Sequence, residues 1–309
     1  MLTESLLTNA ISLWTTLLSE LRGRPMRTLL FFASLLLLSS LVMGQSPPST
    51  APQIVDIPSG KLRLKGYLWK PPGSGPFPAV LFNHGSGGAD AAHTAGMTMT
   101  EAAAALAPIF LKHGYAFFYP CRRGQGLSAD QAPFQQDLLQ REEATHGKEA
   151  RQHLHFTLLT GEQLDDVLAA LSFLKTVPGI DTRRIAMVGH SFGGELTLLA
   201  AEHDGSVRAA VTFGCGANSW LLSRELRERL LAAVGKTAAS IMLIHAENDY
   251  STAPGRDLGG ELERLHRPYV LKIYPPVGQT ADDGHNALYE AVPLWEKDVF
   301  KHLDENLRQ

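Results

Sequence analysis

Ser191 lies at the centre of the segment Gly-His-Ser-Phe-Gly at 189–193, which has the pattern G-x-S-x-G. An apolar run at 185–188 precedes the segment, and a helix-like pattern at 195–201 follows it. A strand, a sharp turn and a helix in this order expose a serine hydroxyl above the edge of a sheet. The free N–H groups and the positive dipole end of the helix face that hydroxyl. We predict that Ser191 is a nucleophile; an ordinary strand–helix turn capped by a serine is the alternative.

A serine hydroxyl needs a neighbouring base at neutral pH, and the base needs a carboxylate that fixes its tautomer. Asp249 and His285 suit these roles, because each follows a predicted strand. Serine, acid and histidine then occur in one of the chain orders known for such triads. Three alternatives stay open: Glu247 or Asp283 as the acid, Asp249 as a simple turn residue, and His285 as an ordinary loop histidine.

The negative oxygen that forms when a serine attacks a carbonyl needs two backbone donors. The N–H of Phe192, directly after the serine, is one candidate. The other is the N–H of Ser86 in the loop Asn-His-Gly-Ser-Gly-Gly at 83–88, whose glycines allow the backbone to approach a substrate closely. We expect His84 to hold this loop in place rather than act as a base; a flexible glycine loop without a role is the alternative.

Strand-like and helix-like patterns alternate along the chain, which predicts an α/β fold with a mostly parallel sheet covered by helices on both faces. The predicted nucleophile, acid and base and the loop at 83–88 each follow a predicted strand. Functional sites of mostly parallel sheets form beyond the carboxyl ends of the strands. We predict two edge strands within 54–69 and further strands at 79–82, 115–120, 185–190, 207–213, 241–245 and 269–274. We predict helices at 101–113, 158–177, 195–201, 220–234, 255–266 and 287–307.

Two segments, 129–156 and 217–234, are predicted surface insertions that form small caps near the site and set its specificity. The first contains His153 and His155, a pair that could indicate a metal. No cysteine or carboxylate stands at a suitable spacing, so we expect no metal site and interpret the pair as part of a solvated face.

The composition of the 309 residues, with 44 % hydrophobic residues and a formal charge of −3, is typical of a globular protein. The sequence has no basic run outside the N-terminus that would indicate nucleic-acid binding, and no dinucleotide or P-loop motif, so we expect no cofactor. Two strands should separate Cys121 from Cys215 by roughly 14 Å, which predicts free thiols.

The N-terminal part differs from the rest of the chain. Three arginines at 22–27 precede an apolar run at 29–43, followed by Gly44 and a Pro/Ser-rich stretch. This pattern predicts a signal peptide cleaved after Gly44 and a protein exported to the periplasm or secreted; an uncleaved membrane anchor at 29–43 is the alternative. Residues 1–25 fit poorly before a signal peptide, which suggests Met26 as the true start. We therefore divide the chain into 1–45, a linker at 46–53 and one domain at 54–309.

Taken together, these motifs resemble the α/β-hydrolase superfamily over about residues 54–307. The loop at 84–88, the Arg-Gly-x-Gly-x-Ser segment at 123–128, the serine motif, the Asn-Asp pair at 248–249 and Gly-His at 284–285 most resemble its dienelactone hydrolase-like and prolyl-oligopeptidase-like branches. The resemblance implies an eight-stranded sheet in which only the second strand is antiparallel. One departure matters: dienelactone hydrolase itself uses a cysteine nucleophile, and here that position is Ser191.

We therefore expect a serine hydrolase that cleaves a small-molecule carboxylic ester through an acyl-serine intermediate. A small serine peptidase or amidase would share the same residues. A catalytically inactive α/β-hydrolase fold that binds a ligand or partner is the alternative from a different class. The sequence does not indicate the acyl group, the alcohol or the oligomeric state.

Overall fold

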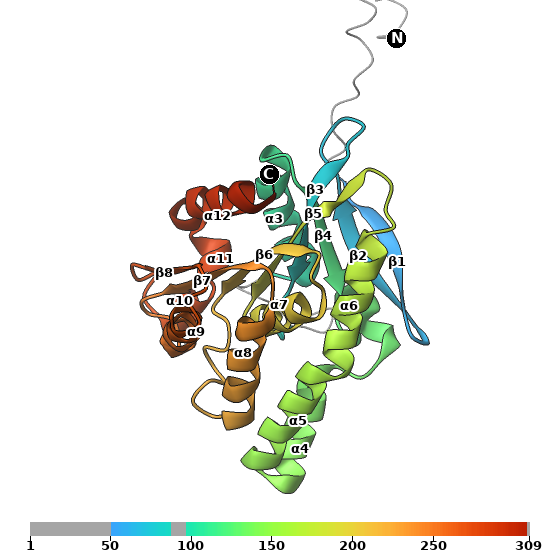
Figure 1. The fold of residues 1–309 in the computed structure, drawn as a ribbon. Helices are drawn as coiled ribbons and strands as arrows, with labels where there is room; N and C mark the ends of the chain where they lie inside the picture. Colours follow the sequence, from blue (N-terminus) through green and yellow to red (C-terminus); the bar gives the residue numbers. More distant parts are fainter. Residues whose placement is uncertain (1–50, 88–96, 308–309) are drawn as a thin grey trace, which may run out of the picture. The chain divides into compact units, whose positions relative to one another are not determined.

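The computed structural model describes residues 51–87 and 97–307, and its centre is one eight-stranded sheet (Figure 1). The strand order is β1-β2-β4-β3-β5-β6-β7-β8. The strands are β1 Gln53–Ser59, β2 Leu62–Trp69, β3 Phe77–Asn83, β4 Ala116–Cys121, β5 Ile180–His190, β6 Val207–Phe213, β7 Ser240–Ala246 and β8 Tyr269–Tyr274.

Strand β2 is antiparallel to both of its neighbours, β1 and β4, and every other neighbouring pair in the sheet is parallel. This confirms the predicted fold class, including the single antiparallel strand. The central strand β3 is buried from Pro78 to Asn83, as expected for a parallel strand covered on both faces. Strand β1 instead alternates buried and exposed residues along most of its length, as an edge strand does.

Helices cover both faces of the sheet and enclose two separate apolar cores. Helices α3 and α12 pack on one face around Phe110, Trp295 and Phe300. Helices α6, α7, α8 and α9 pack on the other around Leu171, Leu199 and neighbouring side chains. The helix bounds are α3 Met99–Lys112, α4 Gln135–His146, α5 Lys148–Thr160, α6 Glu162–Leu174, α7 Phe192–His203, α8 Arg224–Lys236, α9 Ala253–Arg264, α10 Ala281–His285, α11 Ala287–Glu290 and α12 Val292–Leu307, with a 3₁₀ helix η1 at Gly126–Gln131.

The predicted insertion 129–156 contains α4 and most of α5, which form a hairpin extending away from the sheet beyond α6 (Figure 1). The second predicted insertion, 217–234, begins as a loop and becomes helical only after Ser223. The side chain of Ser223 caps α8 by accepting a hydrogen bond from the N–H of Leu226. The helix predicted from residue 220 therefore starts at Arg224. The helix predicted at 287–307 is divided into α11 and α12 by Ala291, whose backbone is not helical.

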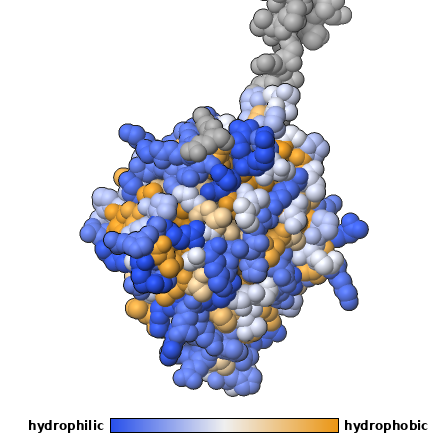
Figure 2. All heavy atoms as spheres, viewed as in Figure 1, coloured by the Kyte–Doolittle hydropathy of each residue, from blue (hydrophilic) through white to orange (hydrophobic). Residues whose placement is uncertain are grey.

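The surface in the view of Figure 2 mixes hydrophilic and hydrophobic areas. Within the described ranges, no helix is long and apolar enough to cross a bilayer. The predicted signal peptide or anchor at 29–43 and most of the predicted linker at 46–53 lie outside the described residues, and β1 already begins at Gln53. Both cysteines are buried and neither forms a disulfide, with β3 and β5 between their strands as predicted.

The two glycines that flank the serine allow β5 and α7 to pack against their neighbours without a gap. An ideal Cβ on Gly193 would lie 1.9 Å from the carbonyl oxygen of Asn83, at the end of β3. An ideal Cβ on Gly189 would lie 2.2 Å from the carbonyl oxygen of Gly193. The obstructing atoms belong to the backbone and cannot move aside as a flexible side chain would.

We predict that Gly193→Ala lowers the free energy of unfolding by at least about 3 kcal/mol, because the new methyl group overlaps backbone atoms. Gly260→Ala is the matched control, since Gly260 is exposed in α9 and nothing lies within 4 Å of its ideal Cβ. Alanine should raise the unfolding free energy there by about 0.5–1 kcal/mol. Urea unfolding of both variants measures the two effects, and equal effects of the two substitutions would contradict the prediction.

Candidate active site

Ser191 connects β5 directly to α7 through a left-handed backbone, with φ 54° and ψ −121°. Its N–H donates to the carbonyl oxygen of Phe213 at 2.8 Å, and its carbonyl accepts from the N–H of Gly194 at 2.8 Å. Positive φ is rare for a residue with a side chain and occurs where the surroundings enforce it. The predicted strand–turn–helix around Ser191 is therefore present, and Ser191 itself is half-buried.

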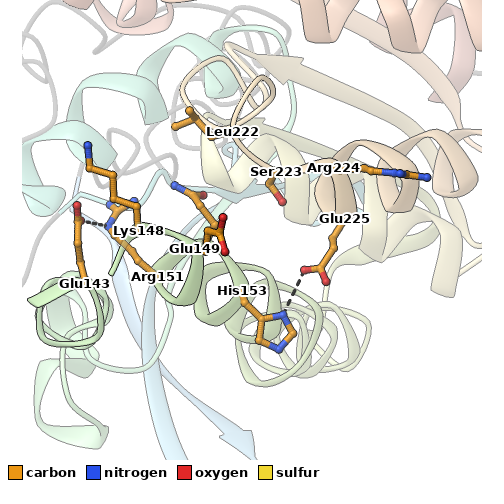
Figure 3. A pocket seen from close by; sticks show the side chains of 10 residues that line it. Glu143, Lys148, Glu149, Arg151, His153, Leu222, Ser223, Arg224 and Glu225 are labelled. Carbon is orange, nitrogen blue, oxygen red and sulfur yellow. Dashed lines mark hydrogen bonds and ion pairs between the residues drawn. The ribbon is translucent and has the colours of Figure 1, made fainter. Parts of the chain in front are cut away.

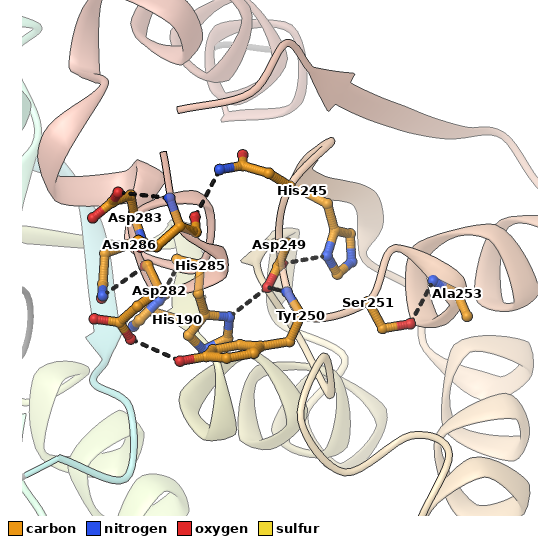
Figure 4. Close-up of polar contacts among 12 residues, drawn as sticks. His190, His245, Asp249, Tyr250, Ser251, Ala253, Asp282, Asp283, His285 and Asn286 are labelled. Atoms are coloured by element: carbon orange, nitrogen blue, oxygen red, sulfur yellow. Dashed lines mark hydrogen bonds and ion pairs between the residues drawn. The ribbon is translucent and has the colours of Figure 1, made fainter. Parts of the chain in front are cut away.

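Asp249 and His285, which are distant in sequence, form a hydrogen bond in the structure (Figure 4). The imidazole Nδ1 of His285 donates to Oδ1 of Asp249 at 2.8 Å. Asp249 is 8 % exposed and His285 is 7 % exposed. The carboxylate thus fixes which nitrogen of His285 carries the proton and leaves Nε2 available as an acceptor.

His285 is held beside the serine turn by two contacts. Nε2 of His190, the residue before Ser191, donates to the backbone carbonyl of His285 at 2.8 Å. An ideal Cβ on Gly214, which follows the Phe213 carbonyl bonded to Ser191, would lie only 2.9 Å from the imidazole of His285. The residues at the ends of β5 and β6 that adjoin Ser191, His190 and Gly214, therefore contact His285.

The other two carboxylates considered as the acid have different positions. Glu247 is exposed, and its backbone N–H donates to the carbonyl of Tyr274. Asp283 caps α10, where it accepts from the N–H groups of Gln279 and Thr280. Of these three carboxylates, the one hydrogen-bonded to the His285 imidazole is Asp249.

Sequence reasoning missed a second histidine on the same carboxylate. His245, near the end of β7, donates from Nδ1 to Oδ2 of Asp249 at 2.8 Å, so each carboxylate oxygen accepts from one imidazole (Figure 4). Burial alone would raise the pKa of Asp249, but the hydrogen bonds from His245 and His285 outweigh it and lower the pKa to about 2. The signal in the sequence is a histidine four residues before the acid, at the buried end of a strand.

Two further titratable groups beside the serine are held neutral by burial. Burial, followed by the neighbouring charge of His285, lowers the pKa of His190 to about 3. Burial raises the pKa of Glu195, in the first turn of α7, to about 8, although Ser219 donates a hydrogen bond to its carboxyl oxygen. A neutral Glu195 at pH 7 places no negative charge near Ser191 that would oppose a developing oxyanion.

The loop that contains Ser86 lies against the start of α7. An ideal Cβ on Gly85 would lie 3.6 Å from Cβ of Ser191. Ser86 follows Gly85 and is half-buried, and Phe192 is 3 % exposed. His84 is buried, donates from Nδ1 to the carbonyl of Gly85 and accepts from the N–H of Arg122, which agrees with the structural role expected for it.

The interpretation of His153 and His155 as one solvated face is wrong for the second residue. His153 is exposed and 3.3 Å from Glu225, whereas the ring of His155 packs edge-on against Phe192 with 5.1 Å between ring centroids. The two side chains differ because residues two positions apart leave a helix in nearly opposite directions. Burial, followed by the charge of Arg151, lowers the pKa of His155 to about 4. No three His, Cys, Asp or Glu side chains are grouped as a metal site within residues 51–87 and 97–307.

A cavity of about 660 Å³ lies between the α4–α5 hairpin and the segment that begins α8 (Figure 3). It involves the two predicted insertions rather than the ends of the strands. Neither Ser191 nor Asp249 nor His285 is among its lining residues, which are Glu143, Lys148, Glu149, Arg151, Gln152, His153, Leu222, Ser223, Arg224 and Glu225.

Comparison with known proteins agrees with this architecture. The dienelactone hydrolase from Anabaena variabilis has a TM-score of 0.57 at 21 % identity, over 83 % of this chain and 99 % of that chain. The acylaminoacyl peptidase of Pyrococcus horikoshii has a TM-score of 0.56 at 19 % identity, over 84 % of this chain and 42 % of that chain. These solved structures define the class: the protein has the α/β-hydrolase fold.

The model of the Dienelactone hydrolase family matches residues 64–280, well over half of the chain. The chain therefore belongs to the dienelactone hydrolase family. A curated relative, the "Putative carboxymethylenebutenolidase" of Synechocystis sp., is 25 % identical over 170 residues, which are 54 % of this chain and 60 % of that protein. The matched stretch thus spans less than two thirds of the relative's length.

We predict that Asp249 contributes about 2 kcal/mol to stability at neutral pH, because its pKa falls from 3.8 to about 2 in the folded protein. A lowered pKa stabilises the fold above the unfolded-state pKa, and the contribution is lost as the pH falls through about 2. Urea unfolding between pH 5 and pH 2.5 should therefore show a steeper loss for the wild type than for Asp249→Asn. Asp56→Asn, on the exposed side of β1, is the control and should follow the wild type. Parallel curves for wild type and Asp249→Asn would contradict the prediction.

Proposed function

We propose that the protein is a serine hydrolase that cleaves small-molecule carboxylic esters with Ser191, His285 and Asp249. The observation that carries the proposal is the 2.8 Å hydrogen bond from His285 to Asp249, beside a serine in a left-handed turn at the start of α7. Nucleophile, base and orienting acid are the three groups that acyl transfer through serine requires.

In this mechanism, Nε2 of His285 accepts the proton of Ser191 while Oγ attacks the carbonyl carbon of the ester. The carbonyl oxygen becomes an oxyanion that accepts hydrogen bonds from the N–H groups of Phe192 and Ser86. His285 then donates the proton to the departing alcohol, which leaves an acyl-serine. A water molecule, deprotonated by His285, then attacks the acyl carbon, and His285 returns this proton to Oγ of Ser191 as the carboxylic acid product leaves. Throughout, Asp249 stabilises the positive charge on His285.

Part of the proposed rim is apolar. Tyr250 is 46 % exposed, and its ring lies 5.1 Å from that of His285. Exposed apolar side chains beside a site favour substrates with an apolar group, which agrees with an uncharged ester.

We predict that Ser191→Ala lowers the hydrolysis of p-nitrophenyl butyrate by at least about a thousandfold, because no group replaces the attacking oxygen. Labelling by a fluorophosphonate probe should disappear as well. Ser172→Ala, which changes an exposed serine of α6, is the control and should keep both activities. Undiminished turnover in Ser191→Ala would refute the proposed nucleophile. Hydrolysis of aminoacyl amides with little ester turnover would instead favour a peptidase.

A second prediction separates a serine from a cysteine mechanism. Cys121 is 0 % exposed and Cys215 is 1 % exposed, and burial raises the pKa of the Cys215 thiol well above its usual value. Buried thiols of this kind are poorly accessible to an alkylating reagent. Iodoacetamide should leave esterase activity within about 20 % of the untreated protein under conditions in which the fluorophosphonate abolishes it. Inactivation by iodoacetamide alone would overturn the assignment of a serine nucleophile.

A further inference from the structure

Arg122 is buried directly beneath the loop that carries Ser86. The residue follows β4, which is adjacent to β3 in the sheet, so its side chain reaches the loop that follows β3. Nη1 donates to the carbonyl of His84 at 2.8 Å and Nη2 donates to the carbonyl of Gly85 at 2.9 Å. Nε donates to Oε1 of Gln163 on α6 at 2.9 Å. One planar guanidinium thus holds two consecutive carbonyl groups of the loop and is itself anchored to a helix.

The same guanidinium also contacts the other proposed oxyanion donor. Cζ of Arg122 lies 5.4 Å from the ring centroid of Phe192. His155 packs against the same ring from α5, at 5.1 Å between centroids. The side chain of Phe192 therefore contacts a cation and an imidazole from two different elements, and this restricts the position of its backbone N–H.

Burial of this arginine is energetically costly, since it is only 2 % exposed. Within residues 51–87 and 97–307, Arg122 donates hydrogen bonds to two backbone carbonyls and one side-chain amide, and it forms no salt bridge with a carboxylate. Burial lowers the pKa of Arg122 to about 10, which still leaves it charged at neutral pH. A buried charge without a salt bridge is a poor source of stability, so the burial of Arg122 needs an explanation other than stability.

The adjacent arginine shows that the two side chains have separate roles. Arg123 points to α6, where Nη2 lies 2.7 Å from Oδ1 of Asp166 and Nη1 lies 3.0 Å from Oε2 of Glu162. Ser59 of β1 donates to the same Asp166. Arg123 is therefore a conventional ion-paired connection between elements, and Arg122 is not.

We propose that Arg122 is a positioning residue of the oxyanion hole. Its guanidinium fixes the 83–87 loop against Phe192, so that the N–H groups of Ser86 and Phe192 point to the same oxygen. Its positive charge adds to the field that stabilises the oxyanion. The inference rests on the proposed function, because an oxyanion hole has meaning only if Ser191 attacks a carbonyl group.

The test compares Arg122→Met with Arg267→Met. Arg267 is a matched control, because its guanidinium also donates to backbone carbonyls, those of Val234, Gly235 and Thr237, at the opposite edge of the sheet. The kcat for p-nitrophenyl butyrate is measured per serine titrated by the fluorophosphonate, so that unfolded protein does not contribute to the concentration of active enzyme. Arg122→Met should lower kcat by about a hundredfold, the effect of a lost oxyanion donor, and change KM by less than about threefold. Arg267→Met should lower the melting temperature and leave kcat per titrated serine unchanged.

A boronic acid provides a second readout, because its adduct with the serine has a tetrahedral oxygen in the oxyanion position. Its Ki should rise in Arg122→Met by about the same factor as kcat falls. Arg122→Lys keeps the positive charge and replaces Arg122→Met in the test if the methionine variant does not fold. A lysine cannot donate to two carbonyls in the fixed geometry of a guanidinium, so kcat should still fall at least about tenfold.

The outcomes are distinct. Wild-type kcat and Ki in Arg122→Met, or in Arg122→Lys if that is the folded variant, would overturn the inference and leave the proposed function intact. An equal loss of kcat per titrated serine in Arg267→Met would reduce Arg122 to general structural support and overturn it as well. A wild-type protein that neither hydrolyses the ester nor reacts with the probe would overturn the proposed function and, with it, this inference.

Discussion

The backbone contact between the first turn of α7 and the end of β3 is the constraint on which the site depends. At Gly193 this contact leaves no space for even a methyl group, because the carbonyl of Asn83 occupies it. The contact places the loop with Ser86 beside the turn with Ser191. It also fixes the N-terminus of α7, whose free N–H groups face the proposed oxyanion. A looser packing here would separate the N–H groups of Ser86 and Phe192, the two proposed oxyanion donors.

Around this contact, the structure arranges charge in a consistent way. The carboxylate of Asp249 is stabilised as an anion by two imidazoles, and Arg122 stays a cation beneath the loop. Burial keeps His190 and Glu195 neutral close to the serine. In the proposed mechanism, the acid that must remain charged is thus the one with hydrogen-bond donors on both oxygens. The carboxyl that would oppose an oxyanion has lost its charge through burial.

Membership of the dienelactone hydrolase family leaves the chemistry of this chain open, because one fold supports several reactions. The differences lie in what this chain places at common positions. A serine stands at the turn where dienelactone hydrolase itself has a cysteine, and Cys121 and Cys215 are both buried. The α4–α5 hairpin and the segment before α8 surround a charged cavity, and surface segments of this kind are the parts of a fold most free to vary.

The sequence by itself determined the order of strands and helices and the mostly parallel sheet, and it predicted which residues at the strand ends form the site. These follow from local periodicity, turn residues and the rule that parallel strands end at a common edge. Only the tertiary structure decided which carboxylate meets His285, that His245 shares it, that His155 faces Phe192, and that Arg122 lies beneath the loop. Each of these depends on which side chains become neighbours across the sheet, and on the burial that results. Apart from His245, which lies four residues before Asp249, the partners are tens of positions apart, and sequence spacing carries neither kind of information for them.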